Sequence, residues 1–161
     1  TAVFAANAAI RRKAAADRNI ADMGSTCVAA RFCLETRELF IAHVGDSRAY
    51  RLRAGRLEQL TTDHTMAELG VTGGRAQHLS RALGTEACPK LDVLLARFEL
   101  DDIFLLCCDG LTKMVGDAAL TQVLTGASSP TVAVTDLVAR ANTQGGQDNI
   151  TAVVVAVTRR G

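Results

Sequence analysis

Residues 103–111 read Ile-Phe-Leu-Leu-Cys-Cys-Asp-Gly-Leu, so an apolar run of six residues ends directly at an Asp-Gly pair. A run that is apolar throughout is typical of a strand whose two faces are both covered. Residues 150–157 form a second largely apolar run, which follows directly on Gly-Gly-Gln-Asp-Asn at 145–149. A shorter run at 39–44 is followed by Gly-Asp at 45–46. The fold is therefore expected to contain buried strands, each with an aspartate and a glycine at one end.

Outward from these strands, the pattern predicts further strands and three helices. The further strands are expected at residues 26–32, 50–52, 56–60 and 91–98, with a hairpin turn at Ala54-Gly55. The helices are expected at residues 2–18, with Phe4, Asn7 and Ala14 on the buried face, at 117–123, and at 130–142 after Ser129-Pro130. This order predicts an α+β domain with largely antiparallel sheets covered by helices. Without a repeat or linker, residues 1–161 are expected to form one domain.

Composition excludes several classes of protein. The chain has 161 residues, 48% of them hydrophobic and 22% charged, with a net charge of +1, which argues against disorder and against nucleic-acid or membrane-surface binding. No apolar run approaches the roughly 18 residues of a membrane span. The five cysteines form no Cys-x-x-Cys pair, which argues against a disulfide framework and a zinc site. A reducing cytoplasm is the expected compartment.

Asp46, Asp109 and Asp148 are candidate metal ligands. Each lies beside glycine at the end of a predicted buried strand, where a carboxylate is held rigidly and water can approach. Hard cations such as Mg²⁺ and Mn²⁺ prefer carboxylate oxygens and retain water ligands. An aspartate beside glycine is also a common turn element, so spacing alone leaves both interpretations open.

Six sequence motifs resemble those of a known protein family. They are Met23-Gly24-Ser25-Thr26, His43-Val-Gly-Asp-Ser-Arg-Ala-Tyr-Arg51, Leu60-Thr-Thr-Asp-His-Thr65, Leu79-Ser-Arg-Ala-Leu-Gly84, Leu105-Leu-Cys-Cys-Asp-Gly-Leu111 and Gly145-Gly-Gln-Asp-Asn-Ile-Thr151. In this order and spacing the chain resembles the metal-dependent protein serine/threonine phosphatases of the PP2C type. The resemblance implies a β-sandwich of two antiparallel sheets flanked by helical layers. It also implies hydrolysis of phosphoserine and phosphothreonine in a phosphorylated protein, with two or three Mg²⁺ or Mn²⁺ ions.

The same resemblance implies roles for individual residues. Asp109 and Asp148 match the two downstream aspartates of the metal centre, and Asp46 matches an aspartate that helps to hold a third, weaker ion together with Asp109. Supporting roles fall to Gly110, Asn149, Ser25 and Thr26. The Asn149 side chain is expected to fix the turn that directs Asp148.

The chain also departs from the family pattern. The family's first metal motif, an Asp-Gly pair followed by Gly-Gly, is not found before the helix at 2–18, and neither is the arginine that binds phosphate. We therefore expect an N-terminally truncated domain with an incomplete two-metal site and exposed sheet edges that favour a dimer. A second departure is the stretch 65–78, which is expected to be a shortened or a mobile flap.

Other functions are weaker fits. Lys113 and Met114 stand where a cysteine phosphatase needs arginine, six residues after a cysteine, and there is no P-loop motif. His43 is expected to be a hydrogen-bonded core residue, His64 to hold a turn, and Arg48 to pair with a carboxylate. Two functions stay open: an active phosphatase, or a non-catalytic phosphatase-like module that binds a partner or phosphoprotein.

Overall fold

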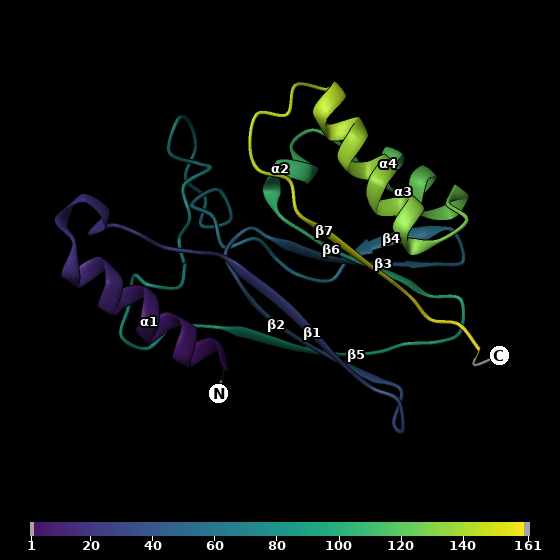
Figure 1. Ribbon diagram of the computed structural model, residues 1–161, viewed down its shortest axis with the longest axis horizontal. Coiled ribbons are helices and arrows are strands. Elements are labelled where there is room, and N and C mark those ends of the chain that lie inside the picture. The colour runs from purple at the N-terminus through teal and green to yellow at the C-terminus, as the bar shows by residue number, and fades with distance from the viewer. Residues whose placement is uncertain (1, 160–161) are drawn as a thin grey trace.

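The computed structural model describes residues 2–159, which form two antiparallel sheets and a small number of helices (Figure 1). The first sheet has the strand order β1-β2-β5, with bounds Cys27–Cys33, Glu38–Val44 and Asp92–Arg97. The second has the order β4-β3-β6-β7, with bounds Arg56–Gln59, Arg48–Arg53, Ile103–Cys107 and Ala152–Ala156. The helices are α1 (Ala2–Ala16), a 3₁₀ turn η1 (Arg18–Ile20), α2 (Asp109–Thr112), α3 (Asp117–Gly126) and α4 (Pro130–Thr143). The two-sheet architecture expected from the resemblance is confirmed.

Strand β6 lies between two cores, which explains its continuously apolar sequence. Phe104 faces the other sheet and packs with Leu39 and Ile41 of β2. Leu105 faces α3 and α4 and packs with Leu120 and Leu137, among others. Figure 1 shows these two helices lying over the outer face of the four-stranded sheet. Because both faces of β6 are covered, it holds the residues that follow it in a fixed position.

The hairpin between β3 and β4 forms at the predicted turn. Ala54 and Gly55 have φ angles of 48° and 76°, as a two-residue type I′ turn requires, and Arg53 pairs with Arg56 across it. The start of α4 is also as predicted, since the Ser129 side chain accepts a hydrogen bond from the Val132 N–H at 3.2 Å.

Helix α1 packs differently from the expectation. Asn7 and Ala14 are buried, but Phe4 is 45% exposed. The Asn7 amide donates to the carbonyl of Glu86 at 3.0 Å and accepts from the Gly84 N–H at 2.7 Å, so the helix is anchored on the loop before β5. The prediction for Phe4 was wrong: the helix is held to this loop through the polar side chain of Asn7, and Phe4 stays exposed.

The stretch predicted to be a flap folds back on itself. Met66 N–H donates to His78 O and Ala67 N–H to Ala76 O, each at 2.8 Å, around glycines with positive φ angles at 70 and 73. It is a short, internally hydrogen-bonded loop. Among residues 2–159, no helix combines the length and apolarity that crossing a membrane would require.

Candidate metal centre

Strand register brings the three candidate aspartates to one end of the four-stranded sheet. β3 and β6 are antiparallel, with Arg48 opposite Cys107. The pairing ends there, and the chain continues to Asp46 before β3 and to Asp109 after β6, near enough for the charge of Asp109 to raise the pKa of Asp46. On the other side of β6, the Cys108 N–H donates to the Thr151 carbonyl at 3.2 Å, which continues the pairing of β6 with the segment before β7. Asp46, Asp109 and Asp148, hereafter the acidic cluster, therefore come from three different segments of the chain.

Gly110 makes the close approach of two of these segments possible. A Cβ atom at this position would lie 2.3 Å from the carbonyl oxygen of Asn149 and 3.4 Å from the Cβ of Asp148. Real Cβ atoms do not approach a backbone oxygen so closely, so only glycine fits here. The supporting role predicted for Gly110 thus has a physical basis: its missing side chain lets Asp148 lie beside Asp109.

Asn149 acts through its backbone. Its N–H donates to Oδ1 of Asp148 at 2.7 Å, and its carbonyl accepts from the Cys108 thiol at 3.1 Å. Within residues 2–159 we find no hydrogen bond to its side-chain amide. The turn before β7 is thus fixed differently from the prediction, because the main chain already provides the partners that the amide was expected to supply.

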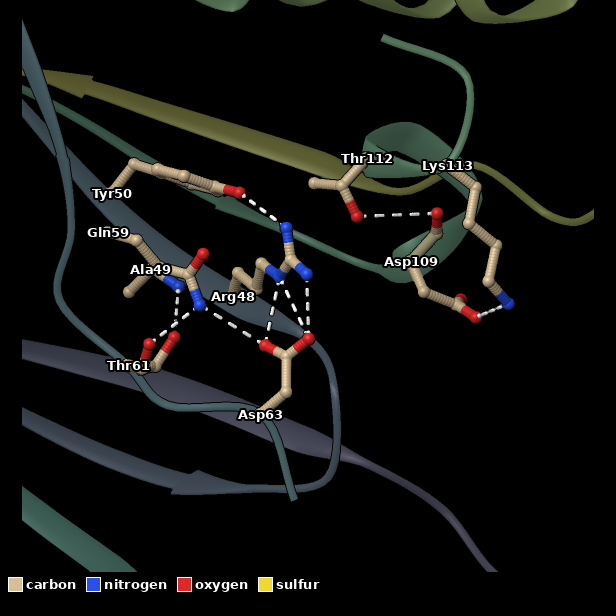
Figure 2. A network of polar contacts seen from close by, with 9 residues as sticks. All are labelled: Arg48, Ala49, Tyr50, Gln59, Thr61, Asp63, Asp109, Thr112 and Lys113. Atoms are coloured by element: carbon tan, nitrogen blue, oxygen red, sulfur yellow. Dashed lines mark hydrogen bonds and ion pairs between the residues drawn. The ribbon is translucent and has the colours of Figure 1, made fainter. Parts of the chain in front are cut away.

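Asp109 begins helix α2 and is paired with a cation. Oδ2 of Asp109 lies 2.5 Å from Nζ of Lys113, one helical turn further along (Figure 2). The hydrogen bond to Asp109 raises the pKa of Lys113, and the charges of Asp46 and Asp148 act in the same direction. Lys113 was not identified from the sequence as a site residue, although its spacing of four from Asp109 was a usable signal.

The electrostatics of the acidic cluster fit a divalent cation. Burial raises the pKa of Asp46, and the nearby charge of Asp109 raises it further. Carboxylates that repel each other in a partly buried site gain from a cation between them. Their oxygens are the ligands that Mg²⁺ and Mn²⁺ prefer, and Lys113 already places a cationic group against one of them.

His64 holds the turn that carries Asp46 through two hydrogen bonds to Gly45. The Gly45 backbone N–H donates to the ring nitrogen Nδ1 of His64 at 3.2 Å. The backbone N–H of His64 in turn donates to the Gly45 carbonyl at 2.8 Å. Nε2 of His64 then contacts Asp92 at 3.1 Å, and Arg81 contacts the other oxygen of Asp92 at 2.9 Å. The prediction that His64 holds a turn is confirmed, whereas Asp92 and Arg81 were not identified as its partners.

Ser25 and Thr26, the two residues directly before β1, support the same region. The Thr26 and Ser47 hydroxyls lie 2.8 Å apart, next to Asp46. Ser25 forms two backbone hydrogen bonds with Leu83, at 3.0 and 2.8 Å. Both residues thus hold the chain around the acidic cluster, and neither adds a charged group to it.

A second group of potential ligands, His43, His64 and Asp92, does not suit a metal ion, although its ligand atoms lie within 4.8 Å of one another. Because Nδ1 of His64 accepts the Gly45 N–H, the ring proton sits on Nε2 and donates to Asp92. The Arg81 guanidinium occupies the open side of the same carboxylate and would repel a cation.

His43 is buried, with 1% exposure, but it is not hydrogen-bonded as predicted. Both of its ring nitrogens lack a hydrogen-bond partner among the described residues. Its ring lies 4.6 Å from the ring of His64, whose own nitrogens are already committed to Gly45 and Asp92. The expectation of a hydrogen-bonded core histidine was therefore wrong.

Arg48 pairs with a carboxylate, as predicted. Its Nε and Nη2 atoms contact the two oxygens of Asp63 at 2.9 and 2.7 Å, and Nη1 donates to the Tyr50 hydroxyl at 2.9 Å (Figure 2). Its charge is therefore neutralised within the protein.

Comparison with known proteins points to one family. Residues 2–70 match the family model described as protein phosphatase 2C. The serine/threonine phosphatase stp of Listeria welshimeri is 37% identical over 153 residues, which covers 88% of this chain and 60% of that protein. This chain therefore spans about 60% of the length of that curated relative.

Solved structures agree with this match. PppA, described as a key regulatory component of T6SS in Pseudomonas aeruginosa, superposes with a TM-score of 0.86 at 36% identity, covering 96% of this chain and 66% of that one. The catalytic domain of the serine/threonine protein phosphatase PstP, in complex with two manganese ions, superposes with a TM-score of 0.83 at 33% identity, covering 97% and 68%. The similarity thus extends over nearly the whole of this chain and about two thirds of each solved one.

Proposed function

This chain belongs to the protein phosphatase 2C family, and on that premise we propose that it hydrolyses phosphoserine and phosphothreonine in phosphorylated proteins, with Mg²⁺ or Mn²⁺ held at the acidic cluster. The observation that carries the proposal is the close approach of the Asp148–Asn149 segment to Gly110, next to Asp109, which a missing side chain makes possible, together with the charges of Asp46, Asp109 and Asp148 that all act on Lys113. An aspartate that only begins a helix or forms a turn does not require a second acidic segment to approach it so closely.

Each carboxylate has a distinct part in the proposed site. Asp109 precedes Gly110, which Asp148 approaches, and these two would share the principal ions, whereas Asp46, on which the charge of Asp109 acts, would complete a further site. A bound divalent cation supplies Lewis-acid polarisation of phosphoryl oxygens and lowers the pKa of its water ligand. The protein's own part is to hold these oxygens in place before the substrate arrives, which is the role of the covered strand β6 and the His64-bonded turn.

The proposed substrate class and compartment follow from the same relatives and from the cysteines. The stp and PstP proteins are named serine/threonine phosphatases, which supports phosphoproteins as substrates of this chain. All five cysteines are free thiols, which favours a reducing compartment, and we place the reaction in the cytoplasm.

The decisive experiment is hydrolysis of a phosphothreonine peptide by this chain, with and without Mn²⁺. Any release of phosphate should require the metal and should fall by at least about 100-fold in Asp109→Asn and in Asp148→Asn. Asp101→Asn is the matched control, because Asp101 is an exposed aspartate in the turn between β5 and β6 and asparagine tolerates its positive φ angle of 68°.

Three outcomes would count against this proposal. Hydrolysis without metal, or hydrolysis unchanged in both cluster variants, contradicts the assigned site. Saturable binding of the phosphopeptide without hydrolysis under any metal condition favours a phosphatase-like binding module instead.

A further inference from the structure

Lys113 stands out as a positively charged group inside the proposed metal centre. Its Nζ atom lies 2.5 Å from Oδ2 of Asp109 (Figure 2). Among the ion pairs of residues 2–159, it is the only cation that pairs with a member of the acidic cluster. The other cation nearby, Arg48, is already bound to Asp63. The cluster therefore has one internal counter-ion.

An ordinary ion pair on a helix surface is the simpler interpretation of a spacing of four residues, and such pairs contribute little. Two observations argue against it. Helix α2 has only four residues, and Lys113 is its C-cap, so the pair does not lie on the face of a long, independently stable helix. The Asp109 side chain is only 26% exposed, and the charges of Asp46 and Asp148 act on Lys113 together with that of Asp109.

The position of Lys113 makes it a competitor of a metal ion for the Asp109 carboxylate. A divalent cation bound at Asp109 needs a carboxylate oxygen, and Lys113 holds one of the two. An ammonium group that stayed within hydrogen-bonding distance would also repel the incoming ion. The Lys113 side chain is 49% exposed, so it can turn out into solvent without leaving a buried cavity.

We propose that Lys113 is the counter-ion of the metal-free acidic cluster and competes with the divalent cation for Asp109, so that it lowers the metal affinity of the site. The inference rests on the proposed function, because it takes the acidic cluster as the metal centre. Metal binding then includes the displacement of Lys113 from Asp109, and the lysine acts as a residue that sets the metal concentration at which the site fills.

The test is a calorimetric titration of the metal-stripped full chain with Mn²⁺ alone. We expect Lys113→Met to bind Mn²⁺ about tenfold more tightly than the unsubstituted protein, which corresponds to about 1.4 kcal/mol. Lys113→Gln is a second neutral variant and should behave alike. Lys113→Arg keeps the charge and should stay within about threefold of the unsubstituted protein. Lys90→Met removes an exposed lysine outside the cluster and should change nothing.

A thermal melt of the same variants provides a second readout. Without metal, Lys113→Met should melt below the unsubstituted protein, because the cluster has lost its counter-ion. Saturating Mn²⁺ should then raise its melting temperature by more than it raises that of the unsubstituted protein.

Asp109→Asn separates the failure of this inference from the failure of the proposed site. If Asp109→Asn weakens Mn²⁺ binding but both neutral Lys113 variants bind with unchanged or lower affinity, the site stands and the role of Lys113 is refuted. If Asp109→Asn leaves binding unchanged, or if no variant binds Mn²⁺, the acidic cluster is not the metal centre and both proposals fail.

Discussion

Gly110 is the single residue on which the geometry of the acidic cluster depends most directly. A Cβ atom there would lie 2.3 Å from the carbonyl oxygen of Asn149, and this oxygen belongs to the backbone and cannot rotate away. Gly110→Ala should therefore push the turn before β7 off β6 and lower the free energy of unfolding by about 1–3 kcal/mol. Urea denaturation measures this loss, and the Mn²⁺ affinity should fall with it.

Gly126→Ala is the matched control for this substitution. Gly126 ends helix α3, and a Cβ there meets nothing within 4 Å. Because alanine favours a helix over glycine, this variant should be unchanged or more stable by up to about 1 kcal/mol. Equal urea midpoints for the two alanine variants would mean that the close approach of the two segments does not depend on the missing side chain of Gly110.

Residue types and neighbours predicted the charged part of the site but not its contacts. Asp46, Asp109 and Asp148 could be identified because each follows or precedes an apolar run beside glycine. The Lys113 pair and the backbone role of Asn149 could not, because sequence order does not say which way a side chain points. His43 shows the same limit: burial was predictable from its strand, but the absence of partners depended on what His64 had already bound.

At the scale of elements, the sequence predicted every strand to within a few residues. The apolar run of β2 and the Ala54-Gly55 turn carry strong local signals, and the structure follows them. Helix α2 was not predicted because four residues show no helical period. Which strands pair across the two sheets was also beyond local pattern, since β2 pairs with β5, about 50 residues away.

The junction between the β3 end and the β5–β6 turn depends on one buried ion pair. The Asp102 side chain has 0% exposure and contacts Nε and Nη2 of Arg53, each at 2.7 Å. It also accepts the N–H of Glu99 at 2.8 Å. Asp102→Ala removes the buried partner of Arg53 and the acceptor of the Glu99 N–H, and should lower the free energy of unfolding by about 2–4 kcal/mol, as urea denaturation would show.

Glu99→Ala is the control for this element because the Glu99 carboxylate binds the same arginine at 2.7 Å but is 63% exposed. An exposed pair of this kind is worth less than about 1 kcal/mol. If Asp102→Ala lowers the free energy of unfolding no more than Glu99→Ala does, burial does not make the Arg53–Asp102 pair more important for stability than the exposed Arg53–Glu99 pair.

At the scale of the whole molecule, the stacking of the two sheets places His43 where water cannot reach it. It lies on the inward face of β2, in line with Leu39 and Ile41, and is 1% exposed. Burial lowers its pKa below the usual 6.5, and the neighbouring His64 lowers it further. The folded protein therefore holds a neutral imidazole that the unfolded chain would protonate in mild acid.

This arrangement makes the stability of the fold depend on pH in a defined window. Because the pKa is lower in the folded than in the unfolded state, the unfolded state binds more protons once the pH falls below about 6.5. The free energy of unfolding should thus fall with acidification from that point, by up to about 1.4 kcal/mol per pH unit, until the folded pKa is reached. Asp102, whose pKa lies below 3.8, contributes its own loss only in stronger acid.

Chemical denaturation at a series of pH values between about 7 and 5, in the unsubstituted protein and in His43→Leu, isolates this contribution. Leucine fills a similar volume without a titratable group, so the slope below about pH 6.5 should flatten in the variant. His78→Leu removes an exposed histidine of the 66–78 loop and should keep the original slope. Parallel slopes in His43→Leu and the unsubstituted protein would show that His43 stays accessible to protons in the folded state, and that the two sheets do not seal it from water.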